Sequence, residues 1–255
     1  MADAEKGRVF HFRQFDVAQD RCAMKVGTDG VLLGAWFSLS TKNLPIRILD
    51  IGTGTGLIAL MAAQRIEEVR SPCQIDAIEI DPVAAAQAHE NFEHSPWAEQ
   101  ITLYSKSLGE FLQAHPNDHL HYDLIISNPP FYNATLKPED TARATARHKD
   151  SLPLTEIMNC AQGRLTENGR LALVYPMNYD NEAMTAAIVA GLKPLRLCNV
   201  LTKEGKICKR RLAEFGRSGA DSGPCLFENL SIRDASGDYT QSYKNLTAPF
   251  YIDLK

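Results

Sequence analysis

The sequence lacks an excess of positive charge. Its 255 residues carry 27 Lys and Arg against 31 Asp and Glu, which gives a formal net charge of -4. A protein that holds nucleic acid through its overall electrostatic field needs a surplus of basic residues. Any contact with nucleic acid must therefore depend on basic side chains that gather locally.

Closely spaced cysteine pairs and long apolar runs are also missing. The six cysteines are dispersed, without a CxxC pair or a Cys and His spacing typical of zinc sites. Reduced thiols in a cytoplasmic protein are therefore expected. His115, His119 and His121 lie in a polar stretch, and without carboxylate or thiolate partners at set spacings they indicate a solvated loop and no metal. Neither a membrane span nor a signal sequence is recognisable, so we expect a soluble protein that is not exported.

Short apolar runs of β type alternate with helical patterns through most of the chain, which predicts βαβ units. Strands are expected at residues 47–51, 74–80, 101–104, 122–127 and 170–175, and helices at 57–69, 83–92 and 181–190. Further β-type segments follow at 195–201, 211–215, 229–233 and 239–240, so the sheet is expected to finish antiparallel. The pattern predicts an α/β fold with an open, doubly wound, mostly parallel sheet, whose ligands bind beyond the carboxyl ends of the strands.

A turn with three glycines at alternate positions follows the first of these strands, in the sequence DIGTGTG at residues 50–56. Glycine allows a backbone to approach a ligand closely and to adopt positive φ. The turn has neither the GxGxxG pattern of dinucleotide sites nor the GK[ST] ending of a P-loop. With the acidic residue ahead of the glycines it resembles motif I of class I S-adenosylmethionine methyltransferases. The resemblance implies that S-adenosylmethionine is bound by Asp50, Gly52, Thr53, Gly54 and Gly56.

Glu79 lies near the carboxyl end of the second expected strand. It follows the glycine turn by roughly 20 residues, the offset at which a doubly wound fold presents a carboxylate to ribose hydroxyls. Asp81 is the alternative, but its place directly before Pro82 is typical of a helix cap. We therefore expect Glu79 to contact the ribose of the cofactor.

The sequence SNPPFY at residues 127–132 directly follows the apolar run YDLII. Two prolines fix φ and remove two N–H donors, which leaves the Asn128 side chain and the Pro129 carbonyl available to a ligand. An aryl or amide amine has a delocalised lone pair, so two acceptors that orient its protons would help it to react without a strong base. Phe131 would supply a ring face. A double-proline turn that merely ends a strand is the alternative.

The NPPF sequence resembles motif IV of amino-methyltransferases that act on adenine N6, guanine N2 or protein glutamine. The resemblance implies that Asn128 and Pro129 hold the target amine, and that Phe131 and Tyr132 contact the substrate. Because motif IV does not separate these substrates, a ribosomal RNA guanine-N2 methyltransferase and a protein glutamine methyltransferase remain alternatives. A protein that binds cofactor or RNA without catalysis is a third, which the intact motif disfavours.

Residues 12–36 resemble the amino-terminal segment of bacterial tRNA (adenine-N6)-methyltransferases that modify the adenine 3′ of the anticodon in a valine tRNA. SPWAEQI, LIISNPPF and NLTAPFYIDL also resemble that family. Membership implies a Rossmann-like class I fold, a seven-stranded sheet with an antiparallel final strand, and a tRNA substrate. The family segment that folds over the cofactor corresponds to Lys25, Thr28 and Asp29. Register places Ser107 and Leu108 beside the cofactor adenine, where the family usually has an acidic residue.

Two basic segments flank these motifs, at residues 137–149 and 203–217. Each is a candidate for RNA phosphates or, alternatively, a solvated charged loop. In the second we expect Lys209, Arg210 and Arg211 to bind substrate. We expect a single domain over residues 1–255, with an amino-terminal segment at 1–40 over the cofactor, a core at 45–195 and a carboxyl-terminal β region at 196–255.

Overall fold

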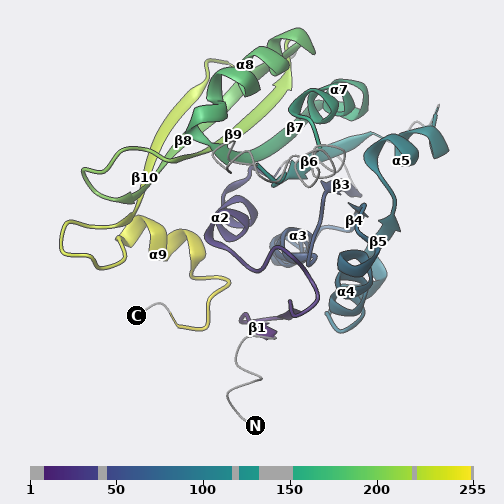
Figure 1. The fold of residues 1–255 in the computed structure, drawn as a ribbon, viewed down its shortest axis with the longest axis horizontal. Coiled ribbons are helices and arrows are strands. Elements are labelled where there is room, and N and C mark those ends of the chain that lie inside the picture. The colour runs from purple at the N-terminus through teal and green to yellow at the C-terminus, as the bar shows by residue number, and fades with distance from the viewer. Residues whose placement is uncertain (1–8, 40–44, 117–120, 132–151, 220–222, 254–255) are drawn as a thin grey trace, which may run out of the picture.

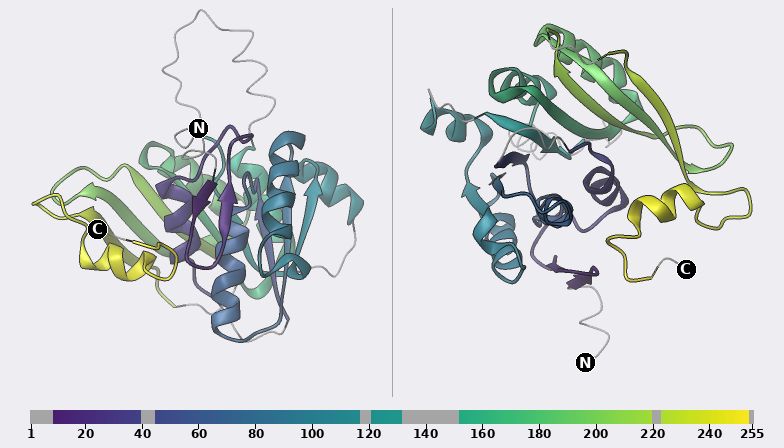
Figure 2. Two further views of the ribbon diagram at one scale, coloured as in Figure 1. Left: turned by 90° about the horizontal axis from the view of Figure 1, so that it is seen from below. Right: turned by 180° about the vertical axis from the view of Figure 1, so that it is seen from behind.

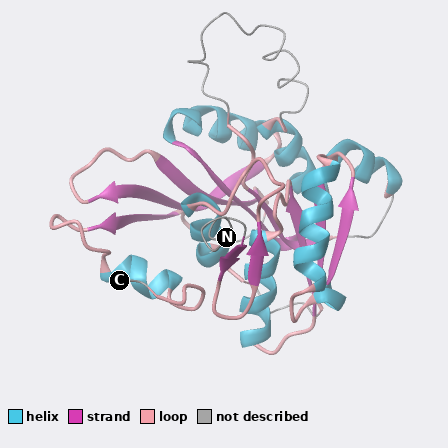
Figure 3. Cartoon of the chain, turned by 60° about the horizontal axis from the view of Figure 1, so that its bottom comes forward, coloured by secondary structure: helices cyan, strands magenta, loops and turns pink. Residues whose placement is uncertain are grey.

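The computed structural model describes residues 9–39, 45–116, 121–131, 152–219 and 223–253. In this part of the chain eight strands form one sheet in the order β10-β8-β9-β7-β6-β3-β4-β5. Figure 3 shows these strands as a central layer between helices. Their bounds are β3 Ile46–Ile51, β4 Cys73–Glu79, β5 Ile101–Ser105, β6 Tyr122–Ser127, β7 Leu165–Pro176, β8 Leu192–Lys203, β9 Arg210–Arg217 and β10 Leu226–Arg233.

The mostly parallel, doubly wound sheet expected from the sequence is confirmed. Its central strands pair in parallel, as β7-β6-β3-β4-β5, and β10 pairs in parallel with β8. Within the described part of this eight-stranded sheet, only β9 runs antiparallel to its neighbours, β7 and β8. Strands β3 and β6 are almost wholly buried because helices cover both faces, which explains their continuous apolar runs.

The sheet differs from the expectation in its last strands. Eight strands are described where seven were expected, and the antiparallel strand is β9, not the final strand β10. The connection from β8 to β9 is too short for a crossover, so β9 must reverse direction, whereas β10 returns along the outer edge of β8. The β-type segment expected at 239–240 is a single bridge from Tyr239 to Arg233, and Thr240 caps the helix that follows.

Helices lie on both faces of the sheet, as Figure 1 shows. Two buried apolar clusters fill the space between them: one holds residues of α2, α3, α4 and α9, and the other residues of α5, α7 and α8. The helices are α2 Thr28–Trp36, α3 Leu57–Glu68, α4 Pro82–Glu93, α5 Leu108–Ala114, α7 Leu154–Arg164, α8 Asp180–Val189 and α9 Gln241–Thr247, with 3-10 turns η1 Ala98–Gln100 and η3 Met177–Tyr179. No described helix has the length and apolarity that crossing a membrane requires.

A short hairpin of β1 Val9–His11 and β2 Asp16–Ala18 precedes α2. In Figure 2 (left) it crosses the middle of the molecule, between the β8–β10 end and the β4–β5 end. The Asn91 side chain on α4 bonds to the backbone N–H and C=O of Ala18, and also donates to the carbonyl of Thr55. The buried amide of Asn91 thus attaches the hairpin to the glycine turn. The segment between β2 and α2 consequently passes across the carboxyl ends of the strands, where Met24, Lys25 and Gly27 line the pocket.

Candidate active site

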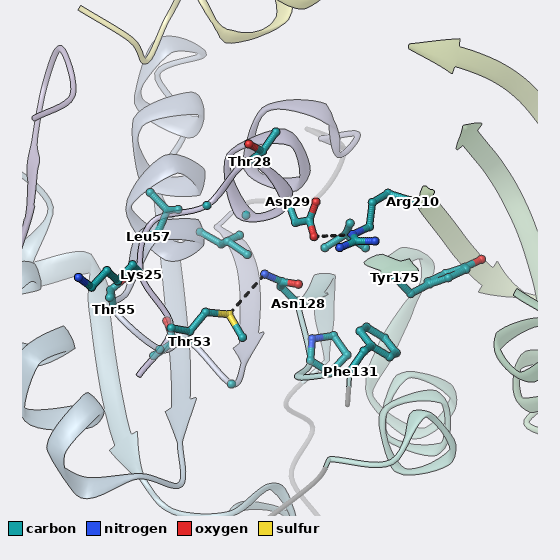
Figure 4. Close-up of a pocket in the computed structure, with 18 of the residues that line it drawn as sticks. Lys25, Thr28, Asp29, Thr53, Thr55, Leu57, Asn128, Phe131, Tyr175 and Arg210 are labelled. Atoms are coloured by element: carbon teal, nitrogen blue, oxygen red, sulfur yellow. Dashed lines mark hydrogen bonds and ion pairs between the residues drawn. The ribbon is translucent and has the colours of Figure 1, made fainter. Parts of the chain in front are cut away.

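A pocket of about 470 Å³ opens at the carboxyl ends of β3, β6 and β7. Its volume is in the range of about 300–1,000 Å³ usual for small-molecule sites. Figure 4 shows side chains from distant parts of the sequence converging on it. Its walls are Met24, Lys25, Gly27, Thr28, Asp29 and Gly30 before and in α2; Gly52, Thr53, Gly54, Thr55, Leu57 and Ile58 at the glycine turn; Asn128, Pro129 and Phe131 after β6; Val174, Tyr175 and Pro176 of β7; and Arg210.

The three glycines of the turn are required for two different reasons, space for a ligand and helix packing. All have positive φ, of 72°, 58° and 83° for Gly52, Gly54 and Gly56. A Cβ atom on Gly52 or Gly54 would meet nothing within 4 Å, so these residues leave open space along the pocket wall. A Cβ on Gly56 would lie 2.4 Å from Cε1 of Phe92, so this glycine lets α3 start against α4. The first two fit close approach of a ligand, and the third is needed for packing.

Asp50 lies behind the turn and is 1% exposed. Its Oδ2 accepts a hydrogen bond of 2.6 Å from the Thr53 hydroxyl, whereas Oδ1 is buried without a hydrogen-bond partner. Burial raises the pKa of this carboxyl to about 7, although the bond from Thr53 opposes the rise. Asp50 is not part of the pocket wall, so it supports the glycine turn from behind through Thr53.

Glu79 supports the glycine turn from the neighbouring strand. Its Oε2 accepts from the backbone N–H of Gly54 at 2.8 Å, and its Oε1 accepts from that of Asp81 at 2.9 Å. It lies beside the turn and not in the pocket wall. Asp81 accepts from the N–H of Val83 and so caps α4, as expected. The ribose contact of Glu79 stays a prediction.

Ser107 and Leu108 do not line the pocket. Ser107 is the N-cap of α5: its hydroxyl accepts from the N–H of Glu110, and the Glu110 carboxylate accepts from the Ser107 backbone and hydroxyl. Leu108 is 4% exposed and belongs to the apolar core. A helix cap accounts for Ser107 locally, and its expected contact with the cofactor adenine stays a prediction.

The amino-terminal segment forms part of the pocket wall, next to the glycine turn and to Asn128. Lys25, Thr28 and Asp29 all line it, as the sequence led us to expect. Asp29, in the first turn of α2, accepts a hydrogen bond of 2.8 Å from Nε of Arg210 (Figure 4). This ion pair joins α2 to the start of β9. Both side chains are more than a third exposed, so it orients the two elements more than it stabilises them.

The residues after β6 form the lower part of the site in Figure 4. The Ser127 hydroxyl donates to the carbonyl of Ile51 at 2.8 Å, which fixes the end of β6 beside the end of β3. Asn128 follows at once, with its Nδ2 4.0 Å from the sulfur of Met24. The Phe131 ring lies 4.8 Å from that of Tyr179, tilted by 53°. The structure thus places the Asn128 amide and a supported aromatic ring in one pocket with the glycine turn.

The three basic residues expected to bind substrate have different surroundings. Arg211 is held inside the protein by bonds of 2.9 Å to both carboxylate oxygens of Asp180 and of 2.7 Å to Oδ1 of Asn199. Arg210 belongs to the pocket, and Lys209 is exposed beside it. Tyr132 and the basic segment 137–149 lie outside the described residues.

Sequence reasoning missed the contribution of β7 to the pocket. Val174, Tyr175 and Pro176 carry no motif, but they end a parallel strand next to β6, and the rule that ligands bind at such ends could have found them. No group of three His, Cys, Asp or Glu side chains that could hold a metal occurs within the described ranges. All six cysteines are free thiols.

The profile of the family called methyltransferase small domain matches residues 34–197. Full-length relatives are also similar. A protein of Christiangramia forsetii is 42% identical over 96% of this chain and 98% of its own length. A protein of Flavobacterium psychrophilum is 43% identical over 96% of this chain and 100% of its own length. Both are named tRNA1(Val) (adenine(37)-N6)-methyltransferase.

Solved structures share the fold at low sequence identity. One from Agrobacterium tumefaciens, described as a predicted O-methyltransferase, has a TM-score of 0.65 and 17% identity, over 87% of this chain and 96% of that one. One from Listeria monocytogenes, assigned to the class I S-adenosylmethionine-dependent methyltransferases, has a TM-score of 0.55 and 14% identity, over 88% of this chain and 71% of that one. The architecture is that of class I methyltransferases.

Proposed function

The chain belongs to the methyltransferase small domain family, and on that premise we propose that it transfers a methyl group from S-adenosylmethionine to N6 of adenine 37 in tRNA1(Val), the reaction for which its relatives are named. One observation carries the proposal: the Asn128 amide and the Phe131 ring share a pocket with the open edges of Gly52 and Gly54. A methyl donor on one wall and a planar amine on the other would meet there.

The cofactor fits the wall built from the glycine turn and the amino-terminal segment. Space beside Gly52 and Gly54 admits a ligand close to the backbone, and the buried Asp50 holds the turn in this shape through Thr53. When bound, S-adenosylmethionine supplies an electrophilic methyl group on a sulfonium. We assign its binding to Lys25, Thr28, Asp29, Gly52, Thr53 and Gly54, with Asp50, Gly56 and Glu79 holding the turn, and keep Ser107 and Leu108 as candidates for the adenine end.

The target amine is assigned to Asn128 and Pro129. An exocyclic amine of adenine is a poor nucleophile because its lone pair is delocalised, so two acceptors that orient its protons direct the lone pair toward the methyl group. The pocket lining offers little to act as a base. Asp29, the one carboxylate in the described part of the lining, is paired with Arg210, and the Tyr175 hydroxyl, whose pKa is raised by burial, donates to Asp180. Orientation is therefore the chief catalytic contribution of the chain.

The adenine substrate is preferred over guanine N2 and protein glutamine because the relatives similar over the whole chain carry the adenine name. The base must leave its stack to reach the pocket, which is easier in an anticodon loop than in a duplex. A tRNA substrate and six free thiols support a cytoplasmic location. We further propose that the chain acts as one domain, in which the segment up to residue 40 covers the cofactor and residues 196–255 form a β region that faces RNA.

The test is nucleoside mass spectrometry of unmodified tRNA treated with the purified protein and S-adenosylmethionine. We expect N6-methyladenosine at position 37. Asn128→Ala should lower kcat by roughly 100-fold, the scale of losing one orienting polar group, while calorimetry finds cofactor affinity nearly unchanged. N2-methylguanosine as the product would favour the guanine alternative. Methylation of a protein glutamine, with no change in tRNA, would overturn the RNA assignment.

A further inference from the structure

A second pocket, of about 330 Å³, adjoins the first and shares three of its residues, Phe131, Pro176 and Arg210. Its remaining lining comes from the residues that follow β7 and precede β9: Met177, Asn178, Cys208 and Lys209. Because three residues line both pockets, the two pockets lie side by side at this edge of the sheet. None of the residues assigned to cofactor or amine binding is confined to the second pocket.

The second pocket has a fixed backbone. Strands β7 and β9 pair up to Pro176 and Arg210, and the N–H of Met177 donates to the carbonyl of Lys209 at 3.0 Å beyond that point. The thiol of Cys208 donates to the carbonyl of Arg210 at 3.0 Å. Lys209 is therefore held by backbone bonded to the end of β7, and Asn178 lies in the 3-10 turn η3 that follows directly.

The charges in this pocket are all positive. Arg210 is neutralised by Asp29 through Nε, and its Nη1 donates to the carbonyl of Lys209. Lys209 is exposed, and neither its ammonium nor the Asn178 amide has a partner in the part of the chain that the structure describes. Among the residues that the structure describes, no carboxylate lines this pocket. An ammonium and an amide N–H that line the same pocket suit an anionic oxygen.

We propose that this pocket is the subsite for the phosphate that joins the target adenosine to its neighbour in the RNA, bound by Lys209 with Asn178 as a second donor. The proposal rests on the proposed function and deepens it. A base stacked on Phe131 in the first pocket leaves its sugar and phosphates at the shared residues, beside the second. Arg210 takes a different part: through Asp29 it holds the amino-terminal wall in place.

The experiment uses anticodon stem-loop RNA in which one phosphate is replaced by a neutral methylphosphonate, either 5′ or 3′ of the target adenosine or at a distant stem position. In the wild-type protein one of the two flanking replacements should lower kcat/KM about tenfold, the scale of one charge-assisted hydrogen bond. In Lys209→Ala that same replacement should have no further effect, because the contact is already gone. Asn178→Asp should lower kcat/KM on the unmodified RNA, because the new carboxylate repels the phosphate. Replacing that phosphate by the methylphosphonate should then lower kcat/KM less than it does in the wild-type protein.

Lys206→Ala is the matched control, since this lysine lies on the same turn but lines neither pocket. It should respond to the three replacements as the wild-type protein does. Equal responses of Lys209→Ala and wild-type protein to both flanking replacements would overturn the subsite. Absence of N6-methyladenosine on the unmodified RNA with wild-type protein would instead overturn the proposed function, so the two failures can be told apart.

Discussion

At the scale of single residues, the candidate site depends on a few polar atoms with defined partners. Asn128 lies beside the flexible side chain of Met24, and the exposed Nδ2 contact of 4.0 Å to its sulfur is weak. The contact therefore fixes the amide only loosely, and the Oδ1 atom that would accept from a substrate amine is not used by it. Asp50 and Glu79, by contrast, are committed to the turn through Thr53 and Gly54. The residues assigned to the reacting groups are thus the ones that the protein leaves available.

Phe131 should act through its ring face. We expect Phe131→Tyr to keep most of the methylation activity, and Phe131→Ala to lower kcat/KM by about tenfold or more, since stacking of a base on an aromatic ring is worth about 1–3 kcal/mol. Steady-state kinetics on the stem-loop RNA measure both. An alanine variant with full activity would mean that the ring contacts only Tyr179.

Asp50 should make the ligand-free protein less stable as pH rises. Burial raises its pKa from the usual 3.8 to about 7, so between these values the folded state binds more protons than the unfolded state. The free energy of unfolding should then fall by up to about 1.4 kcal/mol for each pH unit in that window. Asp50→Asn cannot ionise and lacks this slope. Urea unfolding of both proteins at pH 5, 6, 7 and 8 tests it, and a constant difference in stability would contradict the shift.

At the scale of elements, the glycine turn serves packing as well as binding. Gly56 precedes α3 with a φ of 83°, and an added Cβ would meet Phe92 of α4 at 2.4 Å. Phe92 is 2% exposed and has little room to move. The close packing of α3 against α4 therefore requires a residue without a side chain at position 56.

Gly56→Ala should lower the free energy of unfolding by about 1–3 kcal/mol, through backbone strain and overpacking. Gly109→Ala is the matched control: an added Cβ there would meet nothing within 4 Å, and this glycine lies in α5. Its replacement should be neutral or raise stability by up to about 1 kcal/mol. Thermal or urea unfolding compares the two. Equal changes in the unfolding free energy of the two variants would show that Phe92 moves aside at little cost.

At the scale of the whole molecule, an acidic protein must bind an anionic substrate. With a net charge of -4 it has no general attraction for RNA, so exposed basic side chains near the pocket have to supply it. Arg211 does not contribute freely, because Asp180 and Asn199 hold it with 13% of its side chain exposed. Lys209 is the better placed cation.

Affinity for tRNA should fall as salt rises, and Lys209→Ala should flatten that dependence. Each phosphate contact adds about 0.7 to the slope of log affinity against log salt for single-stranded RNA, so loss of one contact should reduce the slope by about that amount. Arg211→Ala should mainly lower stability, because it leaves Asp180 without its positively charged partner. Filter binding over a salt series and urea unfolding separate the two effects. An unchanged slope in Lys209→Ala would place the phosphate contacts elsewhere.

Local patterns in the sequence were enough for the elements of the core, and together with the family resemblance they led to most of the residues that line the pocket. The apolar run before NPPF is strand β6 with the predicted bounds, and Asp81 with Pro82 begins α4 as predicted. Lys25, Thr28, Asp29, Gly52, Thr53, Gly54, Asn128, Pro129, Phe131 and Arg210 all line one pocket. These outcomes follow because strand periodicity, helix caps and the position of ligands at strand ends depend on neighbours in the chain or on the fold class alone.

What only the tertiary structure decided were the partners that each side chain meets across the sheet. Neighbouring residues Lys209, Arg210 and Arg211 look alike in the sequence. Because β9 pairs with β7 and β8, Lys209 is exposed, Arg210 forms an ion pair with Asp29, and Arg211 forms one with Asp180. The reversal of β9 and the parallel return of β10 follow likewise from pairing between distant segments. Long-range pairing sets which charges are neutralised, and hence which remain for a substrate.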